Sequence, residues 1–315
     1  MPRHTLHGPT MGTRWSATCE LPAESASPAL RVALHAALAA TVQQVDAQMS
    51  PWQPGSALNR FNHTPVGQWV ALESEMLQVL AAALQVCQAS GGAFDPGVGA
   101  LVNAWGFGPV RSAPDAAAIQ QARQQPYQAA TAWLELDVPG QRARRHAPRT
   151  IDLCGIAKGY AVDRMTAVLR QHGIHQALVA LDGELRALGS QASGTPWAVA
   201  VEAPVPGQRS AQGVLELQDM AVATSGNYRR FFTVQGQRLA HSMDPRTQAP
   251  VRNEVASVTV LATSCMQADA WATALLVAGQ RAGEALAQQQ GLQALWVSVA
   301  SAVICRSALA LESHR

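Results

Sequence analysis

Five strand-like segments follow one another between residues 177 and 263: ALVAL (177–181), WAVAVEA (197–203), GVLEL (213–217), MAVAT (220–224) and VASVTVLAT (255–263). All five are short and rich in small or β-branched apolar residues, as strands usually are. Residues 264–279 follow, with apolar residues at helical spacing. Strands in runs, rather than in strict alternation with helices, favour the α+β class over a doubly wound α/β sheet.

Further elements are expected on both sides of this region. Ser27 and Pro28 are typical of a helix start, and the pattern after them predicts a long helix to about residue 49. The remaining patterns predict helices over 74–90, 111–126, 158–171 and 281–291, strands over 131–138 and 149–153, and a closing strand pair in 294–305. The glycine-dense but apolar stretch 91–108 predicts a folded loop with close backbone packing.

Composition and charge limit the classes of protein that remain. The chain has 315 residues, of which 48% are hydrophobic and 14% are charged, so we expect a folded protein rather than a disordered one. No flexible linker divides it, which predicts a single domain over residues 1–315, with two intimately packed subdomains as the alternative. The net charge is only +2, and no cluster of basic residues points to a nucleic-acid partner.

No stretch of the sequence is long and apolar enough to span a bilayer, so no membrane span is expected. The five cysteines form no C-x-x-C pair, which argues against a disulfide framework or a zinc site. No apolar leader is visible at the start, so the expected location is the cytoplasm. A periplasmic or membrane-associated location is the alternative if a leader was trimmed.

Asp269 and Thr273 are a candidate pair of metal ligands. They lie four residues apart on the expected helix 264–279 and therefore share one face of it. A carboxylate and a hydroxyl are hard oxygen ligands of the kind that Mg²⁺ accepts together with substrate phosphates. The alternative is that Asp269 caps or pairs locally and that Thr273 bonds back to the preceding turn. Spacing alone favours this alternative.

His241 and Lys158 are the other polar candidates. His241 stands where a strand runs into the turn at Asp244-Pro245, a place where an imidazole can act as a general base. Lys158 is the single lysine among 23 basic residues and follows the glycine of a strand-to-helix segment, IDLCGIAKG (151–159). The nitrogens at such a helix start can hold an anion, although no Walker or Rossmann pattern is present. The alternatives are that His241 is an ordinary turn residue and that the single lysine reflects chance in an arginine-rich composition.

Three further segments carry weaker signals. Ser225 in ATSGNY has no G-x-S-x-G context, so a serine nucleophile is not expected and a strand end with a local turn is favoured. The segments GAFDP (92–96) and MSPW (49–52) place aromatic side chains on loops. Either could line a cleft for a flat heterocycle, or simply fill the core.

The order of these motifs is more specific than any one of them. The chain resembles the ApbE-type flavin transferases, that is, FAD:protein FMN transferases. The resemblance covers nearly the whole chain and is carried by MGT (11–13), MSPWQPGSALNRFN (49–62), 92–108, IDLCGIAKGYAVD (151–163), DGE (182–184), TSGNY (224–228), HSMDPRT (241–247) and ADAWATALLVAG (268–279). Trp52 stands where the family often has tyrosine, and Asp182 replaces a frequent glycine.

The resemblance implies an α+β fold with mixed or antiparallel sheets, flanking helices and a cleft for FAD and Mg²⁺. The implied reaction moves the FMN half of FAD onto a threonine hydroxyl of an acceptor protein, commonly an electron-transport subunit such as one of a sodium-pumping quinone reductase, and releases AMP. The metal would be bound by Asp269, Thr273 and the carbonyl of Gly155, and His241 would be the base. The flavin or adenine contacts would be Met11, Trp52, Ala93, Phe94, Asp95, Asp152, Lys158 and Met243.

Two other activities remain open at this point. The same cleft could use water as the acceptor, which would make the protein an FAD pyrophosphatase that forms FMN and AMP. It could also bind FAD without turnover, although the joint presence of His241, Asp269 and Thr273 argues against a passive binding module.

Overall fold

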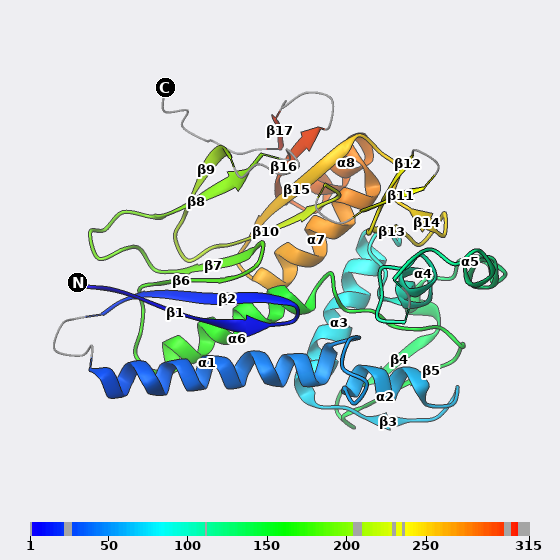
Figure 1. Cartoon of the computed structure of the whole chain (residues 1–315), viewed down its shortest axis with the longest axis horizontal. Helices are drawn as coiled ribbons and strands as arrows, with labels where there is room; N and C mark the ends of the chain where they lie inside the picture. The colour runs from blue at the N-terminus through cyan, green and yellow to red at the C-terminus, as the bar shows by residue number, and fades with distance from the viewer. Residues whose placement is uncertain are drawn as a thin grey trace.

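The computed structural model describes residues 2–21, 27–110, 112–203, 210–228, 231–234, 237–298 and 304–307. Its central feature is an eight-stranded sheet in which every neighbouring pair is antiparallel (Figure 1). The strands, in spatial order, are β1 (Arg3–Thr10), β2 (Thr13–Glu20), β6 (Ala177–Leu181), β7 (Glu184–Leu188), β10 (Ala221–Gly226), β15 (Val255–Ala262), β16 (Gln293–Ser298) and β17 (Ile304–Ser307).

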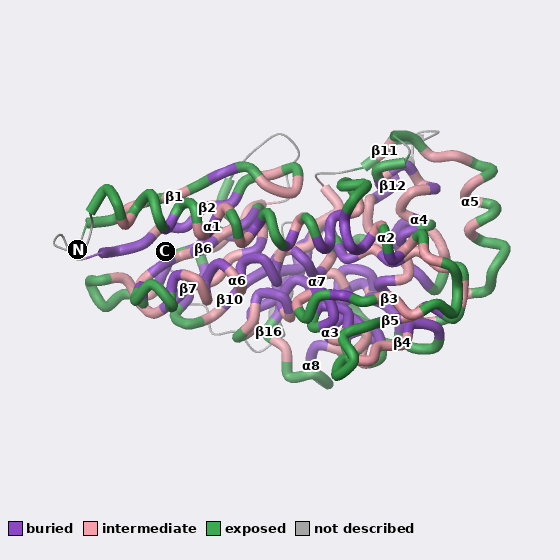
Figure 2. Tube along the Cα trace, turned by 90° about the horizontal axis from the view of Figure 1, so that it is seen from below, coloured by how far each residue is buried: buried purple, intermediate pink, exposed green. Residues whose placement is uncertain are grey.

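One face of this sheet packs on helices. Helices α6 (Ala157–Gln171) and α7 (Cys265–Ala278) lie against it, and the long helix α1 (Pro28–Met49) packs on α6 and β1 (Figure 1). Alternate strand residues such as Ala221, Ala223 and Trp296 are buried in this layer and belong to the main core. Figure 2 shows buried stretches of the chain gathered around α7. Two further helices pack on α7, namely α3 (Ser74–Ala89) and α8 (Gln280–Gln289).

The other face of the sheet is covered by a separate hairpin. Strands β8 (Trp197–Glu202) and β9 (Ala211–Leu217) form a two-stranded sheet of their own. Their inward residues, including Val199 and Leu215, form a second apolar cluster with Val222 and Leu295 of the main sheet. Residues of β10 and β16 that alternate with those of the main core therefore pack against this hairpin. This explains why both strands are apolar on both faces.

A further region of the chain contributes loops and short elements at one end of the main sheet (Figure 1). Its helices are α2 (Ala57–His63), α4 (Gly99–Ala104) and α5 (Ala116–Arg123), with 3₁₀ turns at Pro96–Val98 and Ala130–Ala132. Its strands are β3 (Val70–Ala71), β4 (Leu134–Asp137), β5 (Arg142–Arg145), β11 (Phe231–Val234), β12 (Gln237–Ala240), β13 (Met243–Asp244) and β14 (Ala249–Pro250).

The structure confirms the α+β class and most of the expected elements. Ser27 caps α1 as expected, because its Oγ accepts a hydrogen bond from the nitrogen of Leu30 at 3.1 Å. The expected closing pair corresponds to β16 and β17, and residues 299–303 between them lie outside the described residues. The hairpin of β1 and β2 was not expected, since its strands mix polar residues with apolar ones.

The expected strand over residues 149–153 was wrong. The side-chain amide of Asn62 takes both backbone polar groups of Ile151, donating to its carbonyl at 2.9 Å and accepting from its nitrogen at 2.8 Å. The nitrogen of Asp152 donates instead to the carbonyl of Pro96. Because these partners satisfy the backbone, the segment runs as an irregular strip rather than in a ladder. Of the expected strand 131–138, only Leu134–Asp137 is formed.

No helix among the described residues is both long enough and apolar enough to cross a membrane.

Candidate functional site

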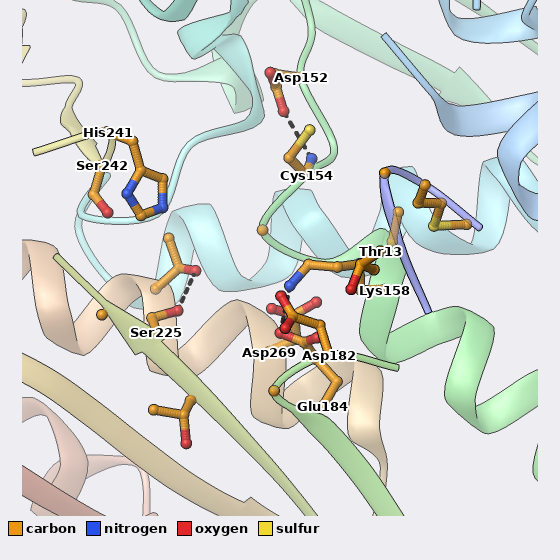
Figure 3. A pocket seen from close by; sticks show the side chains of 18 of the residues that line it. Thr13, Asp152, Cys154, Lys158, Asp182, Glu184, Ser225, His241, Ser242 and Asp269 are labelled. Carbon is orange, nitrogen blue, oxygen red and sulfur yellow. Dashed lines mark hydrogen bonds and ion pairs between the residues drawn. The ribbon is translucent and has the colours of Figure 1, made fainter. Parts of the chain in front are cut away.

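A cleft of about 1040 Å³ opens beside the turn between β6 and β7, the first turn of α6 and the middle of α7. Its walls come from segments that are far apart in the sequence, and Figure 3 shows part of its polar lining. All twelve site residues expected from the sequence line it: Met11, Trp52, Ala93, Phe94, Asp95, Asp152, Gly155, Lys158, His241, Met243, Asp269 and Thr273.

Asp269 and Thr273 face the cleft from α7, and neither makes the local bond that spacing alone had favoured. The carboxylate of Asp269 is buried and accepts from the backbone nitrogen of Gly159 in α6 at 3.0 Å. The hydroxyl of Thr273 lies 2.9 Å from that of Ser225 at the end of β10. Both side chains are thus held by neighbouring elements, on one face of the helix and one turn apart.

Gly155 completes this group from the loop before α6. A side chain at this position would meet the hydroxyl of Thr273 at 3.1 Å and the ring of Phe94 at 3.3 Å. The backbone of Gly155 therefore lies directly against Thr273. Its lack of a side chain permits the close approach that a carbonyl ligand next to Thr273 requires.

Carboxyl groups are concentrated around the single lysine (Figure 3). The ammonium of Lys158 donates to Glu184 Oε1 at 2.6 Å, and Asp182 and Asp269 also act on it electrostatically. Burial lowers the pKa of Lys158, but these carboxylates outweigh that effect and raise it above its ordinary value. Burial raises the pKa of both Glu184 and Asp269, and the lysine only partly offsets the rise. One ammonium group is thus surrounded by three carboxyl groups.

The donors in the cleft fit Mg²⁺ in chemical type. Asp269 offers a buried carboxyl group with one backbone donor, Thr273 offers a hydroxyl, and the backbone of Gly155 lies next to Thr273; carboxylate, hydroxyl and carbonyl oxygens are hard ligands. Among the described residues, no group of three or more His, Cys, Asp and Glu side chains is arranged as a metal site. The set therefore resembles Mg²⁺ sites that have few protein ligands and are completed by substrate phosphates and water.

His241 reaches the same cleft from the end of β12. Its ring makes an edge contact with Phe107, with 6.3 Å between the ring centroids, and Met243 lies buried two residues further on. The turn that follows is fixed by Asp244, whose carboxylate accepts hydrogen bonds from the Arg246 guanidinium. The imidazole therefore lies at the cleft against an aromatic ring, just before a turn in which Asp244 and Arg246 are hydrogen-bonded to each other.

Met11 and Trp52 line another part of the cleft. Met11 and Gly12 are the two central residues of the β1–β2 turn, with φ angles of 46° and 70°. Both angles are positive, as hairpin turns of this length prefer. Trp52 follows α1 on a proline-rich loop and keeps 56% of its surface exposed, which is unusual for a tryptophan that only fills a core. An exposed indole is available to stack on a ligand.

Asp95 and Asp152 also contribute carboxyl groups to the cleft lining. Asp95 is buried and accepts from Tyr127 Oη at 2.9 Å and from the nitrogens of Gly97 and Ala130. Asp152 accepts from the nitrogen of Cys154 at 2.7 Å. Burial raises the pKa of both carboxyl groups. The hydrogen bonds of Asp95 are internal, so it shapes the loop that carries Ala93 and Phe94.

Two polar residues make contacts in the cleft that the sequence motifs did not indicate. Ser225 was expected to be a local turn residue, but it bonds to Thr273 and lines the cleft. Glu184 was only part of a matching tripeptide, yet it holds the single lysine. Its position at the first residue of β7, directly after the tight turn at Asp182, was the available signal.

Comparison with known proteins gives a consistent result. A family model described as the ApbE family matches residues 11–296. Curated relatives include proteins of Vibrio cholerae, 37% identical over 93% of this chain and 86% of the relative, and of Klebsiella pneumoniae, 34% identical over 91% and 82%. Both carry the name FAD:protein FMN transferase.

Solved structures of similar proteins match almost the whole fold. The flavin transferase ApbE from Vibrio cholerae superposes with a TM-score of 0.85 at 33% identity and covers 98% of each chain. The apo form of the Pseudomonas stutzeri flavinyl transferase ApbE also gives a TM-score of 0.85, at 34% identity, covering 98% of this chain and 95% of its own.

Proposed function

This chain belongs to the ApbE family and is a flavin transferase, and we propose that it moves the FMN part of FAD onto a threonine hydroxyl of an acceptor protein, with Mg²⁺ present, and releases AMP. The observation that carries this proposal is that Asp269, Thr273, Gly155 and His241 line a single cleft. A cleft of about 1040 Å³ is of the size that encloses an extended organic ligand. We also propose that residues 1–315 act as one domain.

The metal would be held by Asp269, by Thr273 and by the carbonyl of Gly155. Bound there, Mg²⁺ would supply the positive charge that polarises phosphoryl oxygens and stabilises the AMP leaving group. Asp269 contributes the charge of the site, and Ser225 orients the hydroxyl of Thr273 through their shared hydrogen bond. The ammonium of Lys158, fixed by Glu184, adds a positive charge near the diphosphate.

His241 is proposed to act as the general base. The threonine oxygen of the acceptor attacks the phosphorus of the FMN phosphate, and its proton passes to the imidazole. The bond between that phosphorus and the oxygen that bridges to AMP breaks, so FMN becomes esterified to threonine and AMP leaves. Proton removal by a positioned base typically contributes about 10²–10⁴-fold to such a rate.

The remaining cleft residues are proposed to hold the two ring systems of FAD. Met11 and Trp52 offer apolar and aromatic surface, and Ala93, Phe94 and Met243 form buried walls. Asp95 fixes the loop that bears two of these residues, and Asp152 lies on the strip that leads to Gly155. The resemblance to transferases that modify electron-transport subunits makes such a subunit the proposed acceptor.

The test separates transfer from hydrolysis. The protein is incubated with FAD and Mg²⁺, with and without an acceptor domain, and AMP and free FMN are quantified by chromatography. Transfer predicts AMP release that requires the acceptor and leaves little free FMN. Equal amounts of FMN and AMP without an acceptor would instead identify an FAD pyrophosphatase, and tight FAD binding without any AMP would identify a passive binding module.

A further inference from the structure

The cleft continues beyond the groups that the proposed reaction uses, onto the hairpin face of the main sheet. Its lining includes Leu185 and Val222, whose side chains belong to the second apolar cluster, and the hydrogen-bonded pair Thr224 and Thr259. Ser225, the next residue of β10, faces the helices and bonds to Thr273. The cleft therefore passes around the end of the β6–β7 hairpin and connects the two faces of the sheet.

One wall of this extension is strand β8. Five consecutive residues, 198–202, line the cleft, whereas β9 contributes only Leu215 to it. Successive side chains of a strand point to opposite faces, so a cavity that touches every residue in turn runs along the edge of the strand. The cleft thus follows the edge of β8 that lies away from β9.

That edge is open within the part of the chain that the structure describes. There, β9 is the only strand that pairs with β8, and no other backbone hydrogen bond from Ala198, Val199, Ala200 or Val201 is found. Natural proteins usually protect an open edge with lysine, proline or an inward charge. The sequence of β8, WAVAVE, has none of these before Glu202, and the exposed side chains of Ala198 and Ala200 are small enough to let another backbone approach.

We propose that the open edge of β8 binds an extended segment of the acceptor protein as an added strand, and that this places the acceptor hydroxyl in the catalytic part of the cleft. This inference rests on the proposed function, since a transferase that modifies a protein must admit a stretch of its acceptor into the same cleft. Edge pairing binds a peptide through main-chain hydrogen bonds, which suits acceptors of differing sequence. Leu185 and Val222 provide apolar surface for its side chains.

The geometry limits the length of the docked segment. β8 has six residues, and its pairing with β9 shifts register between Val201 and Glu202. The regular edge therefore spans about 17 Å at roughly 3.3 Å per residue, which is enough for a segment of about five residues. A second copy of this chain is the competing occupant, because an unprotected edge can also pair with itself.

The experiment replaces the two exposed alanines of β8 with lysine, in the double variant Ala198→Lys/Ala200→Lys. Lysine on an open edge opposes strand addition but does not disturb the buried side of the hairpin. The matched control is Val214→Lys on β9, since Val214 is exposed, lies directly opposite Ala200 in the hairpin and is not part of the cleft lining. The probe is the soluble domain of a flavin-accepting subunit of a sodium-pumping quinone reductase.

Three quantities are measured: the KM for the probe with FAD and Mg²⁺, the affinity of the probe by calorimetry, and amide hydrogen exchange of residues 198–201. The proposal predicts that the double variant raises KM and weakens probe binding by roughly tenfold or more, as loss of a central contact does. FAD affinity should change much less, and Val214→Lys should behave as the wild type. The probe should slow exchange of the β8 amides in the wild-type protein.

The outcomes distinguish this inference from the proposed function. Normal KM and binding in the double variant, or unchanged exchange of β8 amides, overturns the edge proposal while transfer itself stands. If the wild type binds the probe at β8 but does not flavinylate it, the docking surface stands and the proposed function fails. A wild-type dimer that the double variant converts to monomer would show that the edge pairs copies of this chain, which overturns the proposal. A wild type that neither binds nor modifies the probe contradicts both.

Discussion

The carboxylate of Asp269 in α7 accepts a hydrogen bond from the backbone nitrogen of Gly159, 3.0 Å away in the first turn of α6. A side chain at Gly159 would collide with the carbonyl of Cys265 and the Cβ of Asp269, so the two helices meet here with almost no space between them. The proposed metal ligand is therefore also the group that caps a nitrogen at the start of the neighbouring helix. If Asp269 binds the metal as proposed, one side chain serves both metal binding and folding.

The first prediction separates these two roles. Asp269→Asn keeps an oxygen for Gly159 but loses the charge, so we expect Mg²⁺-dependent turnover to vanish while stability is nearly retained. Asp269→Ala loses both the acceptor oxygen and the charge. Because the buried nitrogen of Gly159 is then left without a partner, the free energy of unfolding should fall by about 1–3 kcal/mol. Activity assays and urea denaturation check this. Full activity in Asp269→Asn would show that the metal assignment is wrong.

The second prediction concerns Ser225. Its hydroxyl bonds to that of Thr273, and without it the lone pairs of Thr273 are no longer oriented. We expect Ser225→Ala to weaken Mg²⁺ binding in the presence of FAD by about tenfold, as loss of a hydrogen bond to a metal ligand typically does. Calorimetry with Mg²⁺ measures this. The control is Thr224→Val, because Thr224 bonds to Thr259 on the opposite face of the sheet; equal effects in both variants would contradict the assigned role.

The third prediction is a pH dependence of stability. Burial raises the pKa of Glu184 from 4.5 to about 8. A carboxyl whose pKa is higher in the folded state stabilises the fold fully below its unfolded value and loses that contribution as the pH rises to the folded value. The metal-free protein should therefore become less stable between pH 4.5 and pH 8, and Glu184→Gln should flatten this part of the profile.

Thermal denaturation across this pH range measures the effect. Asp137→Asn is the control, because Asp137 lies partly exposed on β4 and its hydrogen bond from Arg142 lowers its pKa, so it titrates below the window. A profile for Glu184→Gln that falls as steeply as that of the wild type would rule Glu184 out as the group responsible.

The fourth prediction tests whether Asp95 acts through the loop rather than by touching the ligand. Tyr127 Oη donates to Asp95 from outside the cleft lining. Tyr127→Phe should lower the free energy of unfolding by about 1–3 kcal/mol, because a buried carboxylate loses one of its donors. The KM for FAD should rise with kcat little changed, since Ala93 and Phe94 lose their support. A fall in kcat alone would instead point to a direct part in catalysis.

The sequence predicted those helices and strands whose formation depends mainly on neighbouring residues. The apolar spacing of α7 and the cap at Ser27 follow from neighbouring residues, and both are formed. The wrong strand over residues 149–153 shows the limit, because the amide of Asn62, nearly ninety residues earlier in the chain, satisfies the backbone there. No local pattern reports such a distant partner.

The same limit applies to the candidate site, where contacts between distant segments could not be predicted. The motifs named residues that do line one cleft, but spacing alone favoured local bonds for Asp269 and Thr273, whereas their partners are Gly159 and Ser225 on other elements. The pairing of Lys158 with Glu184 joins α6 to β7 and likewise depends on tertiary packing. The open edge of β8 could not be anticipated, because the sequence predicts a strand but not which of its edges is paired.

The most direct test of the account is to look for covalent flavin on the acceptor. The protein is incubated with FAD, Mg²⁺ and the quinone-reductase acceptor domain, and the product is examined by in-gel flavin fluorescence and by mass spectrometry of the modified peptide. We expect FMN linked through phosphate to a threonine, a requirement for Mg²⁺, and a rate about 10²–10⁴-fold lower in His241→Ala with FAD affinity little changed. Flavin-free acceptor after FAD has been consumed, or undiminished labelling by His241→Ala, would contradict it.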